Sequence, residues 1–265
     1  MDSQRNHFAI SNYGVSKYTT MNQASEEISI VIPAHNEARR LPATLDVLGD
    51  FLKDYARSVE VVVVDDASSD GTGELARAHA VRPQVIRNPE QMGKGATVRR
   101  GMLESRGTRV RLFMDADLSV PVRFVEIFCA AVESGEDVVI ASRRLAESRI
   151  VKKQPLLRQV GSRYFNVALR AAGLTRSRDT QCGFKAFRAE MVEGLFHDSV
   201  LDGFLFDVEL LVRARLLGYS IAELPVEWEH KGGSTVGPIR CAPDILAEFL
   251  YLLRLKRGAS LKERG

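Results

Sequence analysis

The chain has 265 residues, of which 45% are hydrophobic and 27% are charged, and its formal net charge is +3. This composition is typical of a soluble globular protein, and the length suits one large α/β domain or two small ones. Because basic and acidic residues nearly balance, the charge excludes a strongly basic surface, and no nucleic-acid partner is expected.

Residues 1–27 are polar and lack the apolar segment of a signal peptide, which predicts a flexible leader. Short β-branched runs then alternate with longer amphipathic runs. The predicted strands are residues 28–32, 59–64, 85–87, 110–114 and 138–141. The predicted helices between them are residues 41–55, 72–79, 94–105 and 122–132. This alternation is typical of an α/β fold with a mostly parallel, Rossmann-like sheet flanked by helices.

The alternation becomes less regular after residue 143. The sequence predicts a basic amphipathic helix at residues 152–172 and a loop followed by a strand at residues 179–188. It then predicts a helix at residues 206–217 and a strand at residues 220–224. A last amphipathic helix is predicted at residues 243–255, followed by a basic tail. We therefore expect one domain at residues 28–240 and a C-terminal helix with its tail at residues 241–265.

Two carboxylates, Asp115 and Asp117, directly follow the predicted strand at residues 110–114. Open α/β sheets bind ligands at the carboxyl ends of their strands. A carboxylate pair in that place suits a hard divalent cation whose other positions are filled by a nucleotide's phosphates. On its own such a pair is more typical of an acidic surface loop, but together with the other strand ends it predicts a Mg²⁺ or Mn²⁺ site.

The other predicted strands also end on polar residues. The first runs into the segment PAHNE, the second into Asp65 and Asp66, and a third turn reads Gly93-Lys94-Gly95 at a helix start. Carboxylates can accept hydrogen bonds from a base or ribose, whereas a glycine turn and a lysine at a helix N-terminus favour phosphate. Each turn alone would be an ordinary helix cap. Together at one sheet edge, they predict a nucleotide site.

Two other nucleotide motifs fit less well. The segment GTGELA at residues 71–76 matches the dinucleotide-binding pattern of NAD-dependent dehydrogenases. Acidic residues at positions 65, 66 and 70, however, occupy the place where a pyrophosphate would approach. The turn around Lys94 lacks both the following Ser or Thr and the earlier glycine of a P-loop.

The cysteines bear on the compartment. Cys129, Cys182 and Cys241 are odd in number and far apart, and they form no cluster with histidine. They predict neither a disulfide framework nor a zinc site, which favours a reducing, cytoplasmic compartment. No run of 18 apolar residues occurs, so no transmembrane helix is expected.

Six segments, taken in order, carry a resemblance to known enzymes. PAHNE, VVDDASSDGT, NPEQMGKGATVRRG and DADLS resemble the family 2 glycosyltransferases, which have the GT-A fold. DTQCGFK and FDVELL, further on, are similar to the dolichyl-phosphate β-glucosyltransferase branch, which is related to dolichyl-phosphate mannose synthase. The resemblance covers about residues 28–237 and implies a single GT-A domain. Neither the N-terminal anchor of the eukaryotic glucosyltransferases nor the C-terminal transmembrane helices of some mannose synthases is expected here.

The resemblance implies a role for each matching residue on the donor side. Asp117 would be a catalytic metal ligand, Asp115 would contact the metal or the ribose, and Ser119 would lie beside them. The remaining residues implied in nucleotide-sugar binding are Pro33, Ala34, Glu37, Asp65, Asp66 and Lys94.

On the acceptor side, the resemblance implies that Arg143 binds phosphate and acts in catalysis. Arg158 and Ser162 match a pair that holds the lipid phosphate in mannose synthases, and their spacing places them on one face of a helix. Arg163 and Lys185 are further cations near this region in the sequence.

The implied reaction is an inverting, metal-dependent transfer of a hexose, preferably glucose from UDP-glucose, to a polyprenyl or dolichyl phosphate. The metal would neutralise charge on the leaving diphosphate. A lipid phosphate is already ionised and needs cations, whereas a hydroxyl acceptor needs a general base, for which Asp207 is the candidate. The alternatives are the same fold using GDP-mannose or a soluble acceptor, and a nucleotide-sugar-binding protein without turnover.

A lipid acceptor would require the protein to be peripheral at the cytoplasmic face of a membrane. The predicted helices at residues 152–172 and 243–255 each carry an apolar stripe with basic neighbours. Such helices can lie in a bilayer interface. The same stripes are also typical of helices that pack against a core, and a homo-oligomer interface is a third alternative.

Overall fold

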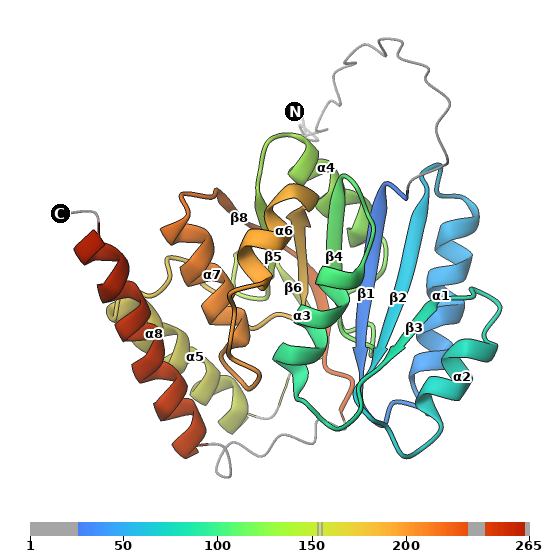
Figure 1. The fold of residues 1–265 in the computed structure, drawn as a ribbon, viewed down its shortest axis with the longest axis horizontal. Coiled ribbons are helices and arrows are strands. Elements are labelled where there is room, and N and C mark those ends of the chain that lie inside the picture. The colour runs from blue at the N-terminus through green and yellow to red at the C-terminus, as the bar shows by residue number, and fades with distance from the viewer. Residues whose placement is uncertain (1–25, 153, 155, 233–241, 263–265) are drawn as a thin grey trace, which may run out of the picture.

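The computed structural model describes residues 26–232 and 242–262, apart from residues 153 and 155 (Figure 1). Most of the predicted leader, and Cys241, lie outside this range. Seven strands form one sheet in the order β3-β2-β1-β4-β7-β5-β8, and two short strands, β6 and β9, pair separately.

The strands are β1 (Ile28–Ala34), β2 (Val59–Asp65), β3 (Gln84–Arg87), β4 (Val110–Met114), β5 (Val138–Ser142), β6 (Arg149–Lys152), β7 (Phe184–Arg188), β8 (Ile221–Pro225) and β9 (Glu227–Glu229). The helices are α1 (Leu41–Lys53), α2 (Thr72–Ala78), α3 (Lys94–Glu104), α4 (Phe124–Glu133), α5 (Leu156–Ala171), α6 (Ala189–Phe196), α7 (Phe206–Leu216) and α8 (Ala242–Lys262).

The sheet is mostly parallel, with one reversed strand. Strands β3, β2, β1 and β4 pair in parallel, as do β5 and β8. Strand β7 is antiparallel to both of its neighbours, β4 and β5. Because β7 is reversed, its first residue, Phe184, pairs with Met114 at the carboxyl end of β4. The loop that enters β7 therefore arrives at the edge where the parallel strands end.

Helices cover both faces of the sheet, because strand side chains point alternately to opposite faces. In β1, Ile30 and Ile32 pack with α1 and α4, whereas Val31 packs with α3, α6 and α7. Leu45 of α1 and Phe128 of α4 are fully buried. Burying such a side chain contributes about 1.5–3 kcal/mol, so these two layers form the main core.

A third layer lies outside α7, where α5 and α8 run side by side (Figure 1). Their shared core contains Leu169, Val212 and Leu252. The helix predicted at residues 152–172 begins later than expected, because Lys152 belongs to strand β6. Within the described residues, no helix combines the length and apolar character needed to cross a membrane.

Candidate active site

The turns after β1 and β2 lie together at the carboxyl edge of the sheet, as the sequence predicts. Ala34 and Asp65, the last residues of these strands, are paired. The Glu37 N–H donates to Thr72 Oγ1 at 2.8 Å, and the Asn36 N–H donates to Ser68 Oγ at 2.9 Å. These cross-links hold the PAHNE segment, with Pro33 and Ala34 at its start, against the turn that follows β2.

Asp65 and Asp66 are almost fully buried, and both bind other parts of the protein. Arg87 Nη1 lies 2.5 Å from Asp65 Oδ2. Asp66 accepts hydrogen bonds from the backbone N–H groups of Met92, at 2.8 Å, and Gly93, at 3.0 Å. The two carboxylates therefore brace the turn between β3 and α3, and their contact with a nucleotide stays a prediction.

The glycines around Lys94 permit a close approach to the loop that precedes α7. Gly93 has a φ of +92°, and a Cβ there would lie 2.7 Å from the Asp202 carbonyl oxygen. A Cβ on Gly95 would lie 2.7 Å from Phe206 Cβ. The Gly93 N–H donates to Asp66, and the Gly95 N–H donates to Asp202 O at 2.9 Å. Two N–H groups expected to bind phosphate are thus bonded within the protein.

Asp115 and Asp117 lie in the turn directly after β4. Asp117 Oδ1 accepts the Ser119 N–H at 2.9 Å, and Leu118 between them has a φ of +52°. The Asp115 N–H donates to the Gly183 carbonyl oxygen at 3.0 Å, which ties this turn to the loop that enters β7. Both carboxylates are partly exposed.

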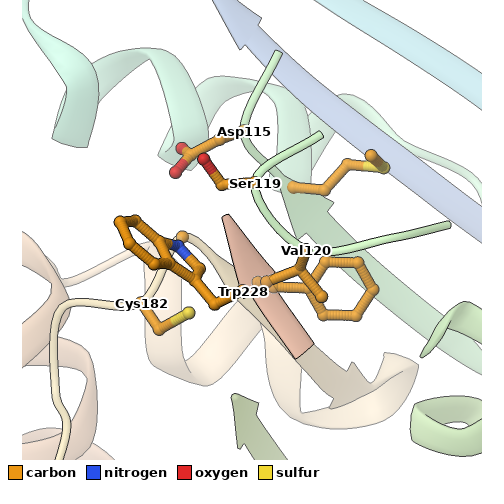
Figure 2. A pocket seen from close by; sticks show the side chains of 8 residues that line it. Asp115, Ser119, Val120, Cys182 and Trp228 are labelled. Atoms are coloured by element: carbon orange, nitrogen blue, oxygen red, sulfur yellow. The ribbon is translucent and has the colours of Figure 1, made fainter. Parts of the chain in front are cut away.

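A small pocket opens beside this turn. Figure 2 shows the Asp115 carboxylate and the Ser119 hydroxyl close together, with the indole of Trp228 across the pocket from them. Trp228 is the only tryptophan of the chain. The Arg143 guanidinium, from the end of β5, lies over the Trp228 ring at 5.4 Å from its centroid. Residues from β4, β5 and β9 therefore meet here.

Acidic and basic groups alternate from the pocket into the interior. Lys94 Nζ lies 2.5 Å from Asp115 Oδ1, and Lys185 Nζ lies 2.5 Å from Asp207 Oδ1. Loss of surrounding water opposes the positive charge of Lys94, but the charges of Asp115 and Asp207 outweigh this effect and raise the pKa of Lys94. Burial raises the pKa of Asp207 against the opposing effects of Lys185 and Lys94. The structure thus places Asp207, the expected base, in a buried ion pair.

Arg143 is held by a carboxylate that the sequence analysis did not assign. Asp179 is fully buried and accepts from Arg143 Nε at 2.6 Å and Nη2 at 2.8 Å. Burial opposes the charge of Asp179, but Arg143 outweighs burial and lowers the pKa of this carboxyl. The pair fixes the guanidinium over Trp228 and leaves Nη1 as the nitrogen not bonded to Asp179. Asp179 is the first residue of the DTQCGFK segment, and the resemblance of that segment to known enzymes could have pointed to this residue.

A second arginine, Arg144, was also missed. Its Nη2 donates to Ser162 Oγ on α5 at 2.7 Å, and its buried Nε has no partner within the described residues. Burial lowers the pKa of Arg144; the carboxylate of Asp179 opposes this, and the charges of Arg143, Arg163 and Arg170 add to the lowering. Ser162 therefore lies beside a group of cations, which is an arrangement suited to an anion.

Arg158 belongs to the first turns of α5, but the placement of its side chain lies outside the described part of the chain. Its contact with a phosphate therefore stays a prediction. Arg158 and Ser162 both belong to α5, and that their side chains act together stays a prediction.

The carboxylates at the end of β4 fit a hard divalent cation. Asp115 and Asp117 supply oxygen ligands. Burial raises the pKa of the nearby Glu37 against the opposing effect of Arg40, and the charges of Asp117 and Asp115 raise it further. A cation would relieve this crowding of negative charge. Among the described residues, no group of three or more His, Cys, Asp or Glu side chains forms a metal cage. Phosphate oxygens and water would have to complete the coordination.

Gly183 gives a test of this geometry. A Cβ on Gly183 would overlap the Asp115 carboxylate, so Gly183→Ala must displace that side chain. We expect kcat/KM for sugar transfer to fall about 10²-fold, the cost of misplacing a reacting group by about 1 Å. Gly194→Ala on α6, where a Cβ meets only the Tyr219 hydroxyl at 3.6 Å, is the matched control. Equal activity of the two variants would show that the position of Asp115 is unimportant.

The fold is of the GT-A type. The solved structure of glucosyl-3-phosphoglycerate synthase from Mycobacterium tuberculosis matches with a TM-score of 0.66 over 86% of this chain and 81% of that chain, at 21% sequence identity. The same enzyme solved with Mn²⁺ and UDP-glucose matches with a TM-score of 0.63, at 19% identity, over 86% of this chain and 79% of that chain. The expected fold class is confirmed.

The chain belongs to Glycosyl transferase family 2, whose family profile matches residues 29–196. A dolichyl-phosphate β-glucosyltransferase from Trichomonas vaginalis is 36% identical over 249 residues, which cover 88% of this chain and 76% of the relative. The human dolichyl-phosphate β-glucosyltransferase is 30% identical over 252 residues, covering 89% and 78%. Glycosyltransferase AglD of Haloferax volcanii is 36% identical over 87% of this chain, which spans only 37% of AglD.

Proposed function

We propose that this chain is an inverting, metal-dependent hexosyltransferase that moves glucose from UDP-glucose to a polyprenyl or dolichyl phosphate. One observation carries the proposal: at one edge of the sheet, Asp115 after β4 lines a pocket together with Trp228, and the Arg143 guanidinium after β5 lies over the Trp228 ring. Asp117 and Arg144 belong to the same two loops. The carboxylates suit a cation with its nucleotide diphosphate, and the arginines suit a second anion. Similarity to dolichyl-phosphate β-glucosyltransferases supports a lipid phosphate as that second anion.

On the donor side, Asp115 and Asp117 would hold Mg²⁺ or Mn²⁺. When bound, the metal supplies Lewis-acid stabilisation of the charge that develops on the leaving diphosphate. Lys94 and the PAHNE segment, which ends at Glu37, lie at the same edge and would position the nucleotide. Attack from the face of the sugar opposite to the diphosphate inverts the configuration at C1.

On the acceptor side, the nucleophile is a phosphate oxygen that is already ionised. No general base is then required, which agrees with the buried, ion-paired state of Asp207. The chemistry instead requires cations that bring one anion next to another. Arg144 and Ser162 would bind the acceptor phosphate, with Arg158 from the same helix and Arg143 facing the pocket.

A screen of donors against acceptors tests the proposal. UDP-glucose and GDP-mannose would each be offered with a polyprenyl phosphate and with glycerol 3-phosphate, in the presence of Mn²⁺. We expect glucose transfer to the polyprenyl phosphate. Transfer only to the soluble phosphate or only from GDP-mannose would replace the proposal with that alternative. If the chain bound the nucleotide sugar but transferred the sugar to no acceptor, the alternative of a nucleotide-sugar-binding protein without turnover would replace the proposal.

Arg144→Gln is expected to raise KM for the polyprenyl phosphate about ten- to a hundredfold, because a charge-assisted hydrogen bond is lost. KM for UDP-glucose should change little, because Arg144 bonds α5 on the acceptor side. Arg158→Ala is expected to act in the same direction. Arg100→Gln, which removes an arginine that pairs with Glu104 on α3, is the control. Equal changes in both KM values would argue against an acceptor role for Arg144.

A lipid acceptor also requires contact with a membrane, for which we propose the outer surface of α5 and α8. This α5–α8 surface exposes the apolar side chains Tyr164, Val167, Leu246 and Leu250. The basic side chains exposed on the same two helices are Arg163, Arg170, Arg254 and Arg257. Each basic residue near an anionic bilayer adds about 1 kcal/mol of attraction, which salt screens.

Leu250→Glu is expected to weaken binding to anionic vesicles at low salt, because it places a negative charge on the exposed face of α8. Phe249, its neighbour, packs in the α5–α7–α8 core, so Phe249→Glu should unfold the protein instead. Ile127→Glu, at an exposed site on α4, is the control for added charge. Co-sedimentation with vesicles measures the effect. A change in oligomeric state, with vesicle binding unaltered, would make this surface a homo-oligomer interface.

A further inference from the structure

Lys94 lies on the carboxylate to which a metal would bind. Its Nζ is 2.5 Å from Asp115 Oδ1, and both side chains are partly exposed. A divalent cation that approaches Asp115 therefore meets a carboxylate that is already neutralised by an ammonium group. The metal and Lys94 must compete for the same negative charge.

The position of Lys94 is fixed by the fold. It is the first residue of α3, and Gly93 and Gly95 on either side pack against the loop that leads into α7. This packing brings the helix start next to Asp207 in the first turn of α7. The buried Lys185 in turn holds Asp207 at 2.5 Å. The backbone of Lys94 is thus anchored, while its side chain is 44% exposed and can be reached from solvent.

We propose that Lys94 is a built-in counter-ion of the metal site, which holds Asp115 until the nucleotide diphosphate draws the ammonium away. The proposal rests on the metal role of Asp115 in the proposed function and adds a coupling to it. Without nucleotide, Asp115 is free to bind the metal only in the molecules in which Lys94 has left it. The apparent metal affinity is therefore the intrinsic affinity multiplied by the fraction of such molecules. A diphosphate that pairs with Lys94 frees Asp115, so the nucleotide and the metal promote each other's binding reciprocally.

The expected change in Mn²⁺ affinity follows from the strength of ion pairs of this kind. Partly exposed ion pairs between lysine and a carboxylate typically correspond to a factor of about two to five in an equilibrium constant. Lys94→Gln should therefore tighten binding of Mn²⁺ alone about two- to fivefold. In the same variant UDP should bind more weakly, and the factor by which UDP tightens Mn²⁺ binding should become smaller.

Equilibrium Mn²⁺ titrations with and without UDP test this coupling on the full chain. Free Mn²⁺ is measured by electron paramagnetic resonance, and the fluorescence of Trp228, which lines the same pocket as Asp115, gives a second signal. Lys94→Met should reproduce Lys94→Gln, whereas Lys94→Arg, which keeps the charge, should resemble the wild type. Lys231→Gln is the matched control, because Lys231 pairs with Glu229, whose backbone bonds the turn that carries Asp115.

The outcomes separate this inference from the proposed function. If Lys94→Gln binds Mn²⁺ alone about two- to fivefold more tightly than the wild type, and UDP tightens Mn²⁺ binding by a smaller factor in the variant, the counter-ion role is supported. If Mn²⁺ affinity and coupling are the same in the wild type and Lys94→Gln, the counter-ion role is wrong and the metal site stands. If Lys231→Gln tightened Mn²⁺ binding as much as Lys94→Gln does, the cause would be the change in net charge near the site, which also overturns the inference. If no variant binds Mn²⁺ even with UDP, the metal site fails, and the inference fails with it.

Discussion

Replacing Asp117 with alanine is expected to abolish sugar transfer while the fold survives. A metal that neutralises a leaving diphosphate contributes several kcal/mol to catalysis, so activity should fall about 10³-fold or more. Stability should change little, because the carboxylate is partly exposed and, among the described residues, its hydrogen bond is to the Ser119 N–H of its own turn. The measurements are product formation with saturating UDP-glucose and the urea midpoint of unfolding.

The control for this variant is Asp50→Ala on α1, where an exposed carboxylate pairs with Lys53. It should keep full activity. The metal role would be refuted if Asp117→Ala kept wild-type turnover, or if turnover in the wild type survived removal of divalent cations by a chelator.

Lys185→Met is expected to lower the free energy of unfolding by about 3–5 kcal/mol, because it leaves a buried carboxylate without its counter-ion. Lys185 has no exposed surface, and its ammonium is shared between Asp207 Oδ1 at 2.5 Å and the Cys182 carbonyl oxygen at 2.7 Å. The Phe113 ring lies 5.3 Å away and adds a cation–π contact. Urea denaturation measures the loss.

A double variant distinguishes a lost ion pair from lost packing. Lys185→Met combined with Asp207→Leu removes both charges, and we expect it to recover most of the stability that the single variant loses. Lys53→Met, which breaks an exposed pair with Asp50, should leave the urea midpoint unchanged. If the double variant were no more stable than the single one, the pair would not be the cause.

The first half of the fold could be predicted from the sequence because its longer strands, β1, β2 and β4, are mostly buried apolar runs. The run at residues 59–64 became β2 (Val59–Asp65), and the segment at residues 110–114 became β4 without change. Strand β9, by contrast, has three residues, EWE, and no apolar alternation. The direction of β7 was also hidden, because a short apolar strand reads the same whether its neighbours run parallel or antiparallel.

The sequence identified which residues lie at the strand ends but not what they bind. The acids of the VVDD segment looked available for a nucleotide, yet Asp66 accepts backbone N–H groups from Met92 and Gly93. Lys185 and Asp207 are 22 positions apart, and no local pattern shows that they form a pair. Arg144 followed Arg143 as an apparently ordinary surface arginine. Partners of this kind depend on how the elements pack, which one sequence without its relatives does not reveal.

The reversed strand β7 has a consequence for the newly synthesised chain. It lies between β4 and β5, so until residues 184–188 leave the ribosome both strands lack their partner on that side. Some 70 residues separate the end of β4 from the start of β7, which at about 5–20 residues per second corresponds to roughly 4–14 seconds of translation. During that time β4, with Leu112 and Phe113, is an open apolar edge of the kind that pairs with other chains. The growing protein is therefore most open to misassociation before β7, the strand that joins β4 to β5, has been made.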